Sequence, residues 1–228
     1  MAYGIKVEIW GERALFTRPE LKVERFSYDV ITPSAARGVI ESSYWHPGMR
    51  YVIDRIHVLN PIKFTNVRRN EIKSKALGSA VRSAASKGGV LPYIDAGADI
   101  QQRASTMLVD VRYVIEAHFD MTDKAKPEDN PGKFADILRR RLRKGQNFSA
   151  PYLGTRECAC NVREWTGNDE ELRGYYADVE ELDLGLMLYD MDYADLDEHG
   201  IPQRITPMFY RPVMRHGVID VAGSEVYR

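Results

Sequence analysis

The sequence predicts an α+β fold in which an N-terminal part alternates strands with helices and a C-terminal part consists mostly of short strands. Residues 3–10 and 106–121 alternate apolar and polar side chains with the period of two that is typical of half-buried strands. Residues 131–145 instead repeat their apolar side chains at helical spacing. The chain has 228 residues, of which 44% are hydrophobic, and this is enough to bury a core.

The first three elements follow one another within about sixty residues. Residues 3–10 (YGIKVEIW) form the first predicted strand. A helix is predicted to begin at Thr32-Pro33, an N-cap residue followed by a proline suited to the first turn, and to end at His46-Pro47-Gly48. Residues 51–59 (YVIDRIHVL) form the second predicted strand.

The next elements are separated by an irregular segment. Residues 63–102 lose periodicity and gain Gly, Ser, Ala and basic residues, which indicates an excursion containing a hairpin or a mobile loop. The strand at 106–121 follows, with Arg112, Glu116 and His118 on its polar face. The helix at 131–145 is amphipathic, with a basic C-terminal end.

This order of elements is close to the split βαβ pattern of ferredoxin-like folds, whose helices cover one face of the sheet. RNA-recognition (RRM-like) folds use the other face. We therefore predict two domains: residues 1–149, ferredoxin-like, and residues 150–228, a small antiparallel β-sheet domain with a hairpin around His216-Gly217.

Composition argues against several classes of protein. No apolar run approaches the roughly 20 residues needed to span a bilayer, and no charged start leads into an apolar stretch, so we expect a cytoplasmic protein without a membrane partner. Cys158 and Cys160 lie too close on one strand for a good disulfide and too far from other ligands for a metal site. We expect free thiols, no metal and no cofactor.

The net charge of -1 conceals a strong asymmetry. Residues 55–115 hold ten basic and four acidic residues, whereas residues 169–199 hold twelve acidic residues and one arginine. A polyanion would be attracted to the first segment and repelled from the second. The candidate phosphate-binding residues are the run Arg68, Arg69, Lys73 and Lys75, the strand residue Arg112, and the helix residues Arg139, Arg140 and Arg143.

Several long blocks resemble the Cas5d family of CRISPR-associated proteins, in the RAMP superfamily. They are WGERALFTRPELKVERFSYDVITPSAARGVIESSYWHP, VIDRIHVLNPIKFTNVRRNE, QQRASTMLVDVRYVIEAHF, YLGTREC and LGLMLYDMDY, and they occur in the order found in the family. The resemblance implies the two domains described above. It also implies a metal-independent endoribonuclease that cleaves precursor CRISPR RNA within the repeat by 2′-hydroxyl attack. Such an enzyme stays bound to the guide RNA as a subunit of the type I-C interference complex.

The resemblance further implies catalytic residues. Tyr44, in SSYWHP, matches a tyrosine near the end of the first helix, and His118, in YVIEAHF, matches a histidine on a later strand. The lysine of the family pattern has no counterpart, because Glu116 and Ala117 stand before His118. The cationic group could instead be Arg112, Lys124 or Lys126, and the other histidine candidates are His46 and His57. Tyr44 could also be a core residue and His118 a surface residue without a catalytic role.

Two other functions remain open at this point. One is a non-catalytic scaffold subunit that binds the 5′ handle of the guide RNA, which the missing lysine favours. The other is a general binder of duplex nucleic acid, including double-stranded DNA, which the charge asymmetry alone would allow.

Overall fold

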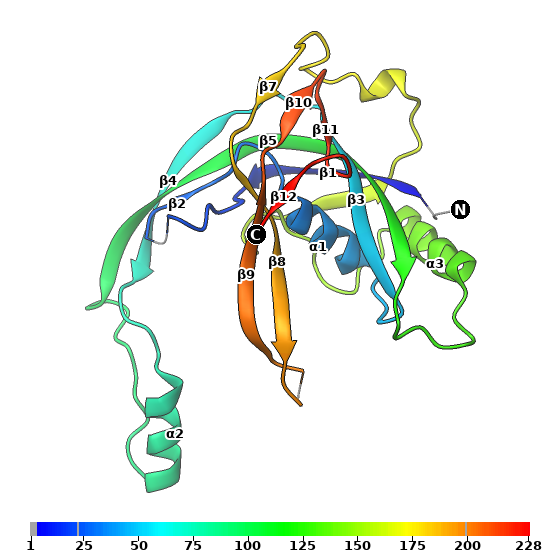
Figure 1. Cartoon of the computed structure of the whole chain (residues 1–228). Coiled ribbons are helices and arrows are strands. Elements are labelled where there is room, and N and C mark those ends of the chain that lie inside the picture. The colour runs from blue at the N-terminus through cyan, green and yellow to red at the C-terminus, as the bar shows by residue number, and fades with distance from the viewer. Residues whose placement is uncertain (1–3, 22, 199) are drawn as a thin grey trace.

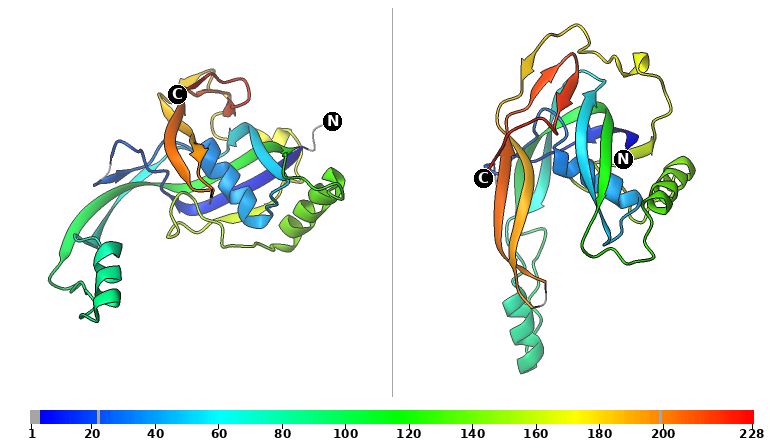
Figure 2. Two further views of the ribbon diagram at one scale, coloured as in Figure 1. Left: turned by 60° about the horizontal axis from the view of Figure 1, so that its bottom comes forward. Right: turned by 45° about the vertical axis from the view of Figure 1, so that its right-hand side comes forward.

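The structure is a computed structural model that describes residues 4–21, 23–198 and 200–228. A strongly curved antiparallel sheet arches over two helices, a helical arm projects away from the body, and a long hairpin lies beside the first helix (Figures 1 and 2). The strands are β1 Ile5–Ala14, β2 Arg25–Phe26, β3 Met49–Val58, β4 Phe64–Ile72, β5 Ile100–Met121, β6 Asn161–Glu164, β7 Leu182–Asp183, β8 Met187–Leu196, β9 Pro202–Tyr210, β10 Val213–Arg215, β11 Val218–Asp220 and β12 Val226–Tyr227. The helices are α1 Pro33–Ser43, α2 Gly78–Lys87, α3 Pro131–Lys144 and the short 3₁₀ helix Glu170–Leu172.

The large sheet is built around β5. Its lateral order is β6-β1-β5-β3-β11-β10-β7, and β2 and β4 pair with the N-terminal half of β5. Antiparallel registers such as Val7 with Ile115 and Tyr51 with Phe119 bring the apolar residues of neighbouring strands onto one face. The fold of mixed helices and strands on a large antiparallel sheet is confirmed. The ferredoxin-like assignment stays a prediction, supported by the chain order β1-α1-β3-β5-α3-β6 within the lateral order β6-β1-β5-β3.

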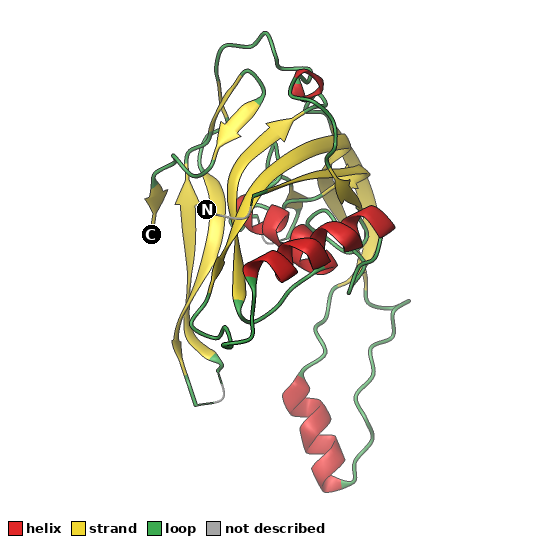
Figure 3. Ribbon diagram, turned by 90° about the vertical axis from the view of Figure 1, so that its right-hand side faces the viewer, coloured by secondary structure: helices red, strands yellow, loops and turns green. Residues whose placement is uncertain are grey.

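Helices α1 and α3 cover the apolar face of the sheet (Figure 3). Helix α1 begins as predicted, because the Thr32 hydroxyl accepts a hydrogen bond from the Ala35 N–H at 3.2 Å and Pro33 occupies the first turn. Helix α3 begins with an Asn130 side-chain cap and ends at Gly145, whose φ of 62° is left-handed. Their inward stripes, Ala36, Val39, Ile40, Phe134, Leu138 and Leu142, are buried in the same core as Val7 and Ile9.

The irregular segment predicted at 63–102 does contain a hairpin. β4 pairs with β5 from Phe64 opposite Leu108 to Ile72 opposite Ile100. The connection, residues 73–99, is here called the arm; it includes α2, in which no residue is buried. The sequence did not predict this helix, because a helix without a buried face has no apolar stripe to mark it.

The C-terminal part contributes to two sheets. β6, β7, β10 and β11 join the large sheet, whereas β12, β9 and β8 form a separate three-stranded antiparallel sheet. The hairpin predicted around His216-Gly217 is confirmed: both residues have positive φ and connect β10 to β11. The division at residue 149 stays a prediction. Tyr3, the predicted start of the first strand, lies outside the described residues, within which no helix is long and apolar enough to cross a membrane.

Candidate active site

The face of the sheet opposite the two helices carries a cluster of charged residues from three strands. Because side chains alternate along a strand, Lys6 of β1 and Glu116 of β5 lie on this polar face, opposite one another. Strand β3 contributes Arg55 and His57 to the same face, owing to a bulge between Ile53 and Arg55. We call Lys6, Arg55, His57 and Glu116 the Glu116 cluster.

Glu116 is the centre of this cluster. Its carboxylate lies 3.1 Å from the Lys6 ammonium, 3.1 Å from Nε2 of His57 and 3.7 Å from the Arg55 guanidinium. Burial favours a higher pKa for Glu116, but hydrogen bonds from Lys6 and His57 outweigh it and lower the pKa. For His57 the balance is the opposite: burial lowers the pKa of the ring, and the Glu116 carboxylate beside it does not offset this. Nδ1 of His57 is buried without a hydrogen-bond partner among the described residues, so the neutral ring fits this site better than the charged one.

A pocket of about 580 Å³ opens beside the Glu116 cluster. Its other walls come from the segment 169–177 and from His216 and Val218 of the β10–β11 hairpin. Asp169 reaches back across the pocket and accepts a hydrogen bond from Lys6 at 3.0 Å. The site is therefore a concave, charged surface with both cationic and anionic side chains.

His118 lies on the same polar face, two residues beyond Glu116. Its Nδ1 is 2.8 and 2.9 Å from the two carboxylate oxygens of Asp54. An Nδ1–H donated to Asp54 leaves Nε2 free to accept or donate a proton, and the Asp120 carboxylate lies 3.9 Å from Nε2. His118 is thus a half-buried histidine held in a defined orientation by a carboxylate.

Tyr44 lies on the other face of the sheet. It is the C-cap residue of α1, is 8% exposed, and packs its ring 6.1 Å from that of Phe134, centre to centre. The hydroxyl of Tyr51, whose strand partner is Phe119, donates to the backbone oxygen of Tyr44 at 3.1 Å. Burial raises the pKa of Tyr44. Since His118 is the neighbour of Phe119 on β5, it points away from this core, and the structure does not bring Tyr44 and His118 together.

Of the other histidine candidates, His57 belongs to the Glu116 cluster, whereas His46 has structural surroundings. The His46 ring packs 4.7 Å from the Phe134 ring, and its Nδ1 accepts the N–H of Gly48 at 3.1 Å. The cation candidates Lys124 and Lys126 lie in the loop between β5 and α3, where the Lys126 N–H donates a hydrogen bond to the Asp129 carboxylate at 2.8 Å.

The predicted phosphate-binding residues fall into two groups. Arg69 pairs with Glu157, Arg112 with the buried Glu8, and both Arg139 and Arg143 with Glu164. These guanidinium groups already pair with carboxylates of the same chain. No ion pair between described residues involves the other members of the set, all of which are exposed: Arg68, Lys73, Lys75 and Arg140.

Sequence reasoning missed Asp54 and the roles of Lys6 and Arg55. The polar side of the first strand did contain Lys6, and Arg55 was counted in the basic segment. Strict alternation along residues 51–59 would place Arg55 on the same side as Tyr51 and Ile53. The bulge at Asp54 reverses this, and a bulge has no reliable signal in a single sequence.

Comparisons with known proteins identify the family of the chain. The profile of a family described as CRISPR-associated protein (Cas_Cas5) matches residues 4–222. A Mannheimia succiniciproducens protein named CRISPR pre-crRNA endoribonuclease Cas5d is 46% identical over 223 residues, covering 97% of this chain and 96% of the relative. A Thermus thermophilus protein of the same name is 36% identical over 242 residues, covering 98% and 95%.

A solved structure described as a CRISPR-associated protein superposes with a TM-score of 0.68 at 26% sequence identity, covering 99% of this chain and 96% of the other. The matches extend over both sheets, so the fold as a whole is that of a CRISPR-associated protein. Within that class, the chain belongs to the Cas5d family, as the sequence blocks indicated.

Proposed function

We propose that this chain is an endoribonuclease that cleaves precursor CRISPR RNA within the repeat and stays bound to the guide RNA as a subunit of the type I-C interference complex. One observation carries the proposal: two relatives named CRISPR pre-crRNA endoribonuclease match this chain at 46% and 36% identity over nearly its whole length. The polar face supplies side chains suited to that chemistry.

The proposed reaction needs no metal, because the RNA provides its own nucleophile. The 2′-hydroxyl oxygen bonds to the adjacent phosphorus while the bond from phosphorus to the 5′-oxygen breaks. A base takes the proton from the 2′-hydroxyl, and an acid gives a proton to the departing oxygen. The products are a 2′,3′-cyclic phosphate and a 5′-hydroxyl. A well-placed proton-transfer group contributes roughly 10²–10⁴ to the rate.

His118 is the proposed proton-transfer residue. Its Nδ1 is engaged by Asp54, so Nε2 is the atom that would face the RNA. Asp54 is then a positioning residue that fixes the tautomer and the orientation of the ring. The side chain of Asp54 is 33% exposed and that of His118 is 24% exposed, so both are accessible from the polar face.

Arg55 is the proposed source of positive charge near the scissile phosphate. Its side chain is 56% exposed, and its strand partner Glu116 lies two residues from His118, about 7 Å along β5. The Arg55 guanidinium lies 3.7 Å from the Glu116 carboxylate, which is too long for a hydrogen bond. Its N–H donors are therefore available to a phosphate. Lys6 is less available, because it also pairs with Asp169.

Tyr44 remains a predicted catalytic residue, but its position restricts what it can do. It lies across the sheet from His118, so a single phosphate cannot contact both side chains. A role for Tyr44 requires RNA at the C-terminal end of α1, where Arg141 also lies, its guanidinium 5.3 Å from the Tyr44 ring. The two residues are therefore tested separately.

The RNA-binding surface is proposed to include the unpaired cations of β4 and the arm. Arg68 is exposed on β4, and Lys73 and Lys75 follow at the base of the arm. Tyr93, which is 86% exposed on the arm, offers a ring on which an unpaired base can stack. Long, exposed and basic, the arm has the composition of a segment that closes over nucleic acid.

The deciding experiment incubates the purified chain with its own repeat RNA in EDTA and identifies the ends of the products. Wild type is compared with His118→Ala, Asp54→Asn and Tyr44→Phe. The control is Gln203→Ala, which changes an exposed side chain of β9 outside the candidate site. A 5′-hydroxyl product whose yield falls with His118→Ala and Asp54→Asn, but not with the control, supports the proposal.

The same samples separate the alternatives. Tight binding with intact RNA in every sample, wild type included, would identify a scaffold subunit instead. Equal affinity for repeat RNA and for an unrelated duplex at moderate salt would identify a general nucleic-acid binder, because electrostatic binding does not depend on sequence.

A further inference from the structure

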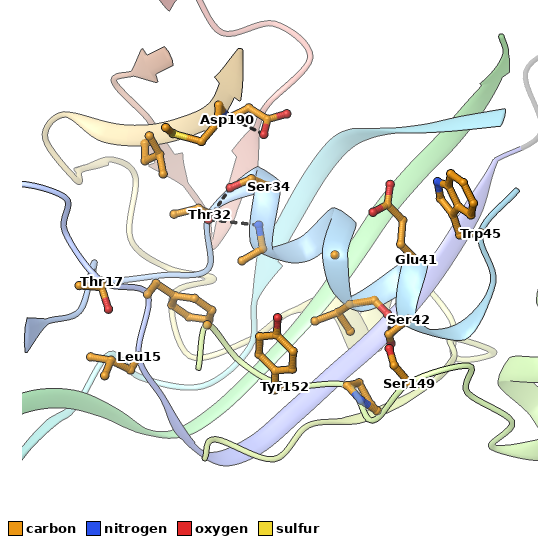
Figure 4. Close-up of a pocket in the computed structure, with 18 of the residues that line it drawn as sticks. Leu15, Thr17, Thr32, Ser34, Glu41, Ser42, Trp45, Ser149, Tyr152 and Asp190 are labelled. Atoms are coloured by element: carbon orange, nitrogen blue, oxygen red, sulfur yellow. Dashed lines mark hydrogen bonds between the residues drawn. The ribbon is translucent and has the colours of Figure 1, made fainter. Parts of the chain in front are cut away.

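A second pocket lies away from the polar face, on the outward side of α1 (Figure 4). Its volume is about 710 Å³. One wall is α1 with its cap residue Thr32, and the others are β8, the segment 148–154 and residues 15–17, which follow β1. The inward side of α1 packs against the sheet, so this pocket belongs to the face of the helix that the fold leaves unfilled.

Aromatic side chains from three separate parts of the chain surround this α1 pocket. Phe148 is 87% exposed, Trp45 59%, Tyr193 57% and Tyr152 42%. Isolated exposed apolar residues are ordinary, but a group of large ones around a single concavity is typical of a binding site. Trp and Tyr are also the residues most enriched at the centres of protein interfaces.

Gly38 is a second, independent sign of a ligand. It lies in the middle of α1 and lines the pocket, and a Cβ added there would meet no atom within 4 Å. A mid-helix glycine lowers helix stability, and here no contact with a described residue requires it. Gly154 in the same pocket is different, because its φ of +83° and the Leu15 backbone oxygen at 2.0 Å exclude a side chain. The bare backbone at Gly38 leaves room for a group from outside the chain.

The charges around the α1 pocket select the kind of ligand. Glu41 and Asp190 line it, and Asp190 belongs to the β8–β9 hairpin, whose residues 187–210 include five acidic residues and one arginine. Asp190 is neutralised by Arg37, whereas Glu41 lies 3.7 Å from the same guanidinium and keeps 31% of its side chain exposed. Burial raises the pKa of Glu41, so a cation beside it would stabilise its charged form. RNA phosphates would be repelled here.

We propose that the α1 pocket is a docking site for another protein subunit, which places an apolar side chain over Gly38 and a lysine or arginine beside Glu41. This inference rests on the proposed function, in which the chain works inside a complex. The partner segment is thus defined by its chemistry: an apolar anchor flanked by positive charge. Its docking would bury Trp45 and Tyr193.

The test uses the full-length chain, co-expressed with the other subunits of the type I-C interference complex and purified through a tag on this chain. Gly38→Leu fills the pocket with a good helix-forming residue, so it should melt at or above the wild-type temperature. It should weaken assembly by at least about tenfold, as expected for the centre of an interface. Glu41→Gln should weaken assembly by about threefold or more, and Glu180→Gln, which removes an exposed acid elsewhere, should not change it.

Binding and cleavage of repeat RNA by the same variants decide what occupies the pocket. Unchanged RNA binding with lost assembly supports the inference. Normal assembly by folded Gly38→Leu, or a wild-type chain that assembles with no other subunit, overturns it. Loss of RNA affinity by Gly38→Leu with assembly intact also overturns it, because the occupant is then RNA. A chain that assembles through this pocket but never cleaves RNA refutes the proposed catalytic function alone.

Discussion

Replacing Arg112 tests whether this arginine stabilises the fold or binds RNA. The sequence assigned Arg112 to RNA, but its guanidinium donates to the Glu8 carboxylate at 2.7 Å, and the side chain of Glu8 is only 2% exposed. Arg163 holds the other carboxylate oxygen. A hydrogen bond to a charged group contributes roughly 1.5–3 kcal/mol. Because 42% of the Arg112 side chain is exposed and water can replace part of the contact, we expect Arg112→Ala to cost about 1.5–2 kcal/mol.

For a chain of this length, each kcal/mol shifts the melting temperature by about 2–4 °C, so Arg112→Ala should melt roughly 3–8 °C below wild type. The assay is thermal unfolding of Arg112→Ala and of Arg68→Ala, combined with the affinity of both for repeat RNA at one salt concentration. Arg68→Ala, an exposed change, should leave stability within about 0.5 kcal/mol and weaken RNA binding. An Arg112→Ala variant that melts like wild type but binds RNA more weakly would refute this reasoning.

Three further predictions concern the stability of the fold. Folding lowers the pKa of His57, so near and below the ordinary histidine pKa of about 6.5 the unfolded chain binds more protons than the folded chain. The free energy of unfolding should therefore decrease as pH falls below about 6.5, and the decrease should be smaller in His57→Gln. Denaturant unfolding at pH 7.5 and pH 5.5 measures this difference. Gly154→Ala places a Cβ 2.0 Å from the Leu15 backbone oxygen, at a φ of +83° that disfavours a side chain. It should lower the free energy of unfolding by at least about 1–3 kcal/mol in the same assay. An unchanged unfolding midpoint would contradict that close approach. Thr32→Ala removes the α1 cap and should cost about 1 kcal/mol, with Thr32→Ser as the variant that keeps the bond.

The regular elements could be predicted because their signals are local. Alternation in β1 and β5 marks positions such as Val7 and Ile115, which are fully buried in the structure. The Thr32-Pro33 and Gly145 boundaries also depend only on neighbouring residues, and both helices begin and end within a few residues of the predicted positions. The sequence therefore predicted the three long strands β1, β3 and β5 and both helices packed against them.

The candidate site could be predicted only in part, because it depends on pairings between distant residues. His118 was identified from the resemblance, but its contact with Asp54, 64 residues away, depends on strand register and on a bulge. Arg69 and Glu157 are 88 residues apart, and no local pattern links them. Counting charges along the chain reveals the charge asymmetry. It does not show which cations form ion pairs with carboxylates in the folded chain.

That pairing changes what the basic composition predicts about RNA binding. Each cation that neutralises a phosphate of a single strand adds roughly 0.7 to the slope of log affinity against log salt concentration, so the eight residues assigned from sequence would give a slope near 6 in magnitude. Four of them pair with carboxylates of the same chain, and the four unpaired ones give a slope of about 3 in magnitude. A slope near 3 would mean that RNA contacts the unpaired cations and leaves the internal ion pairs intact. A slope near 6 would mean that RNA displaces Glu8, Glu157 and Glu164 from their arginines, which would couple RNA binding to a rearrangement of the sheet edge.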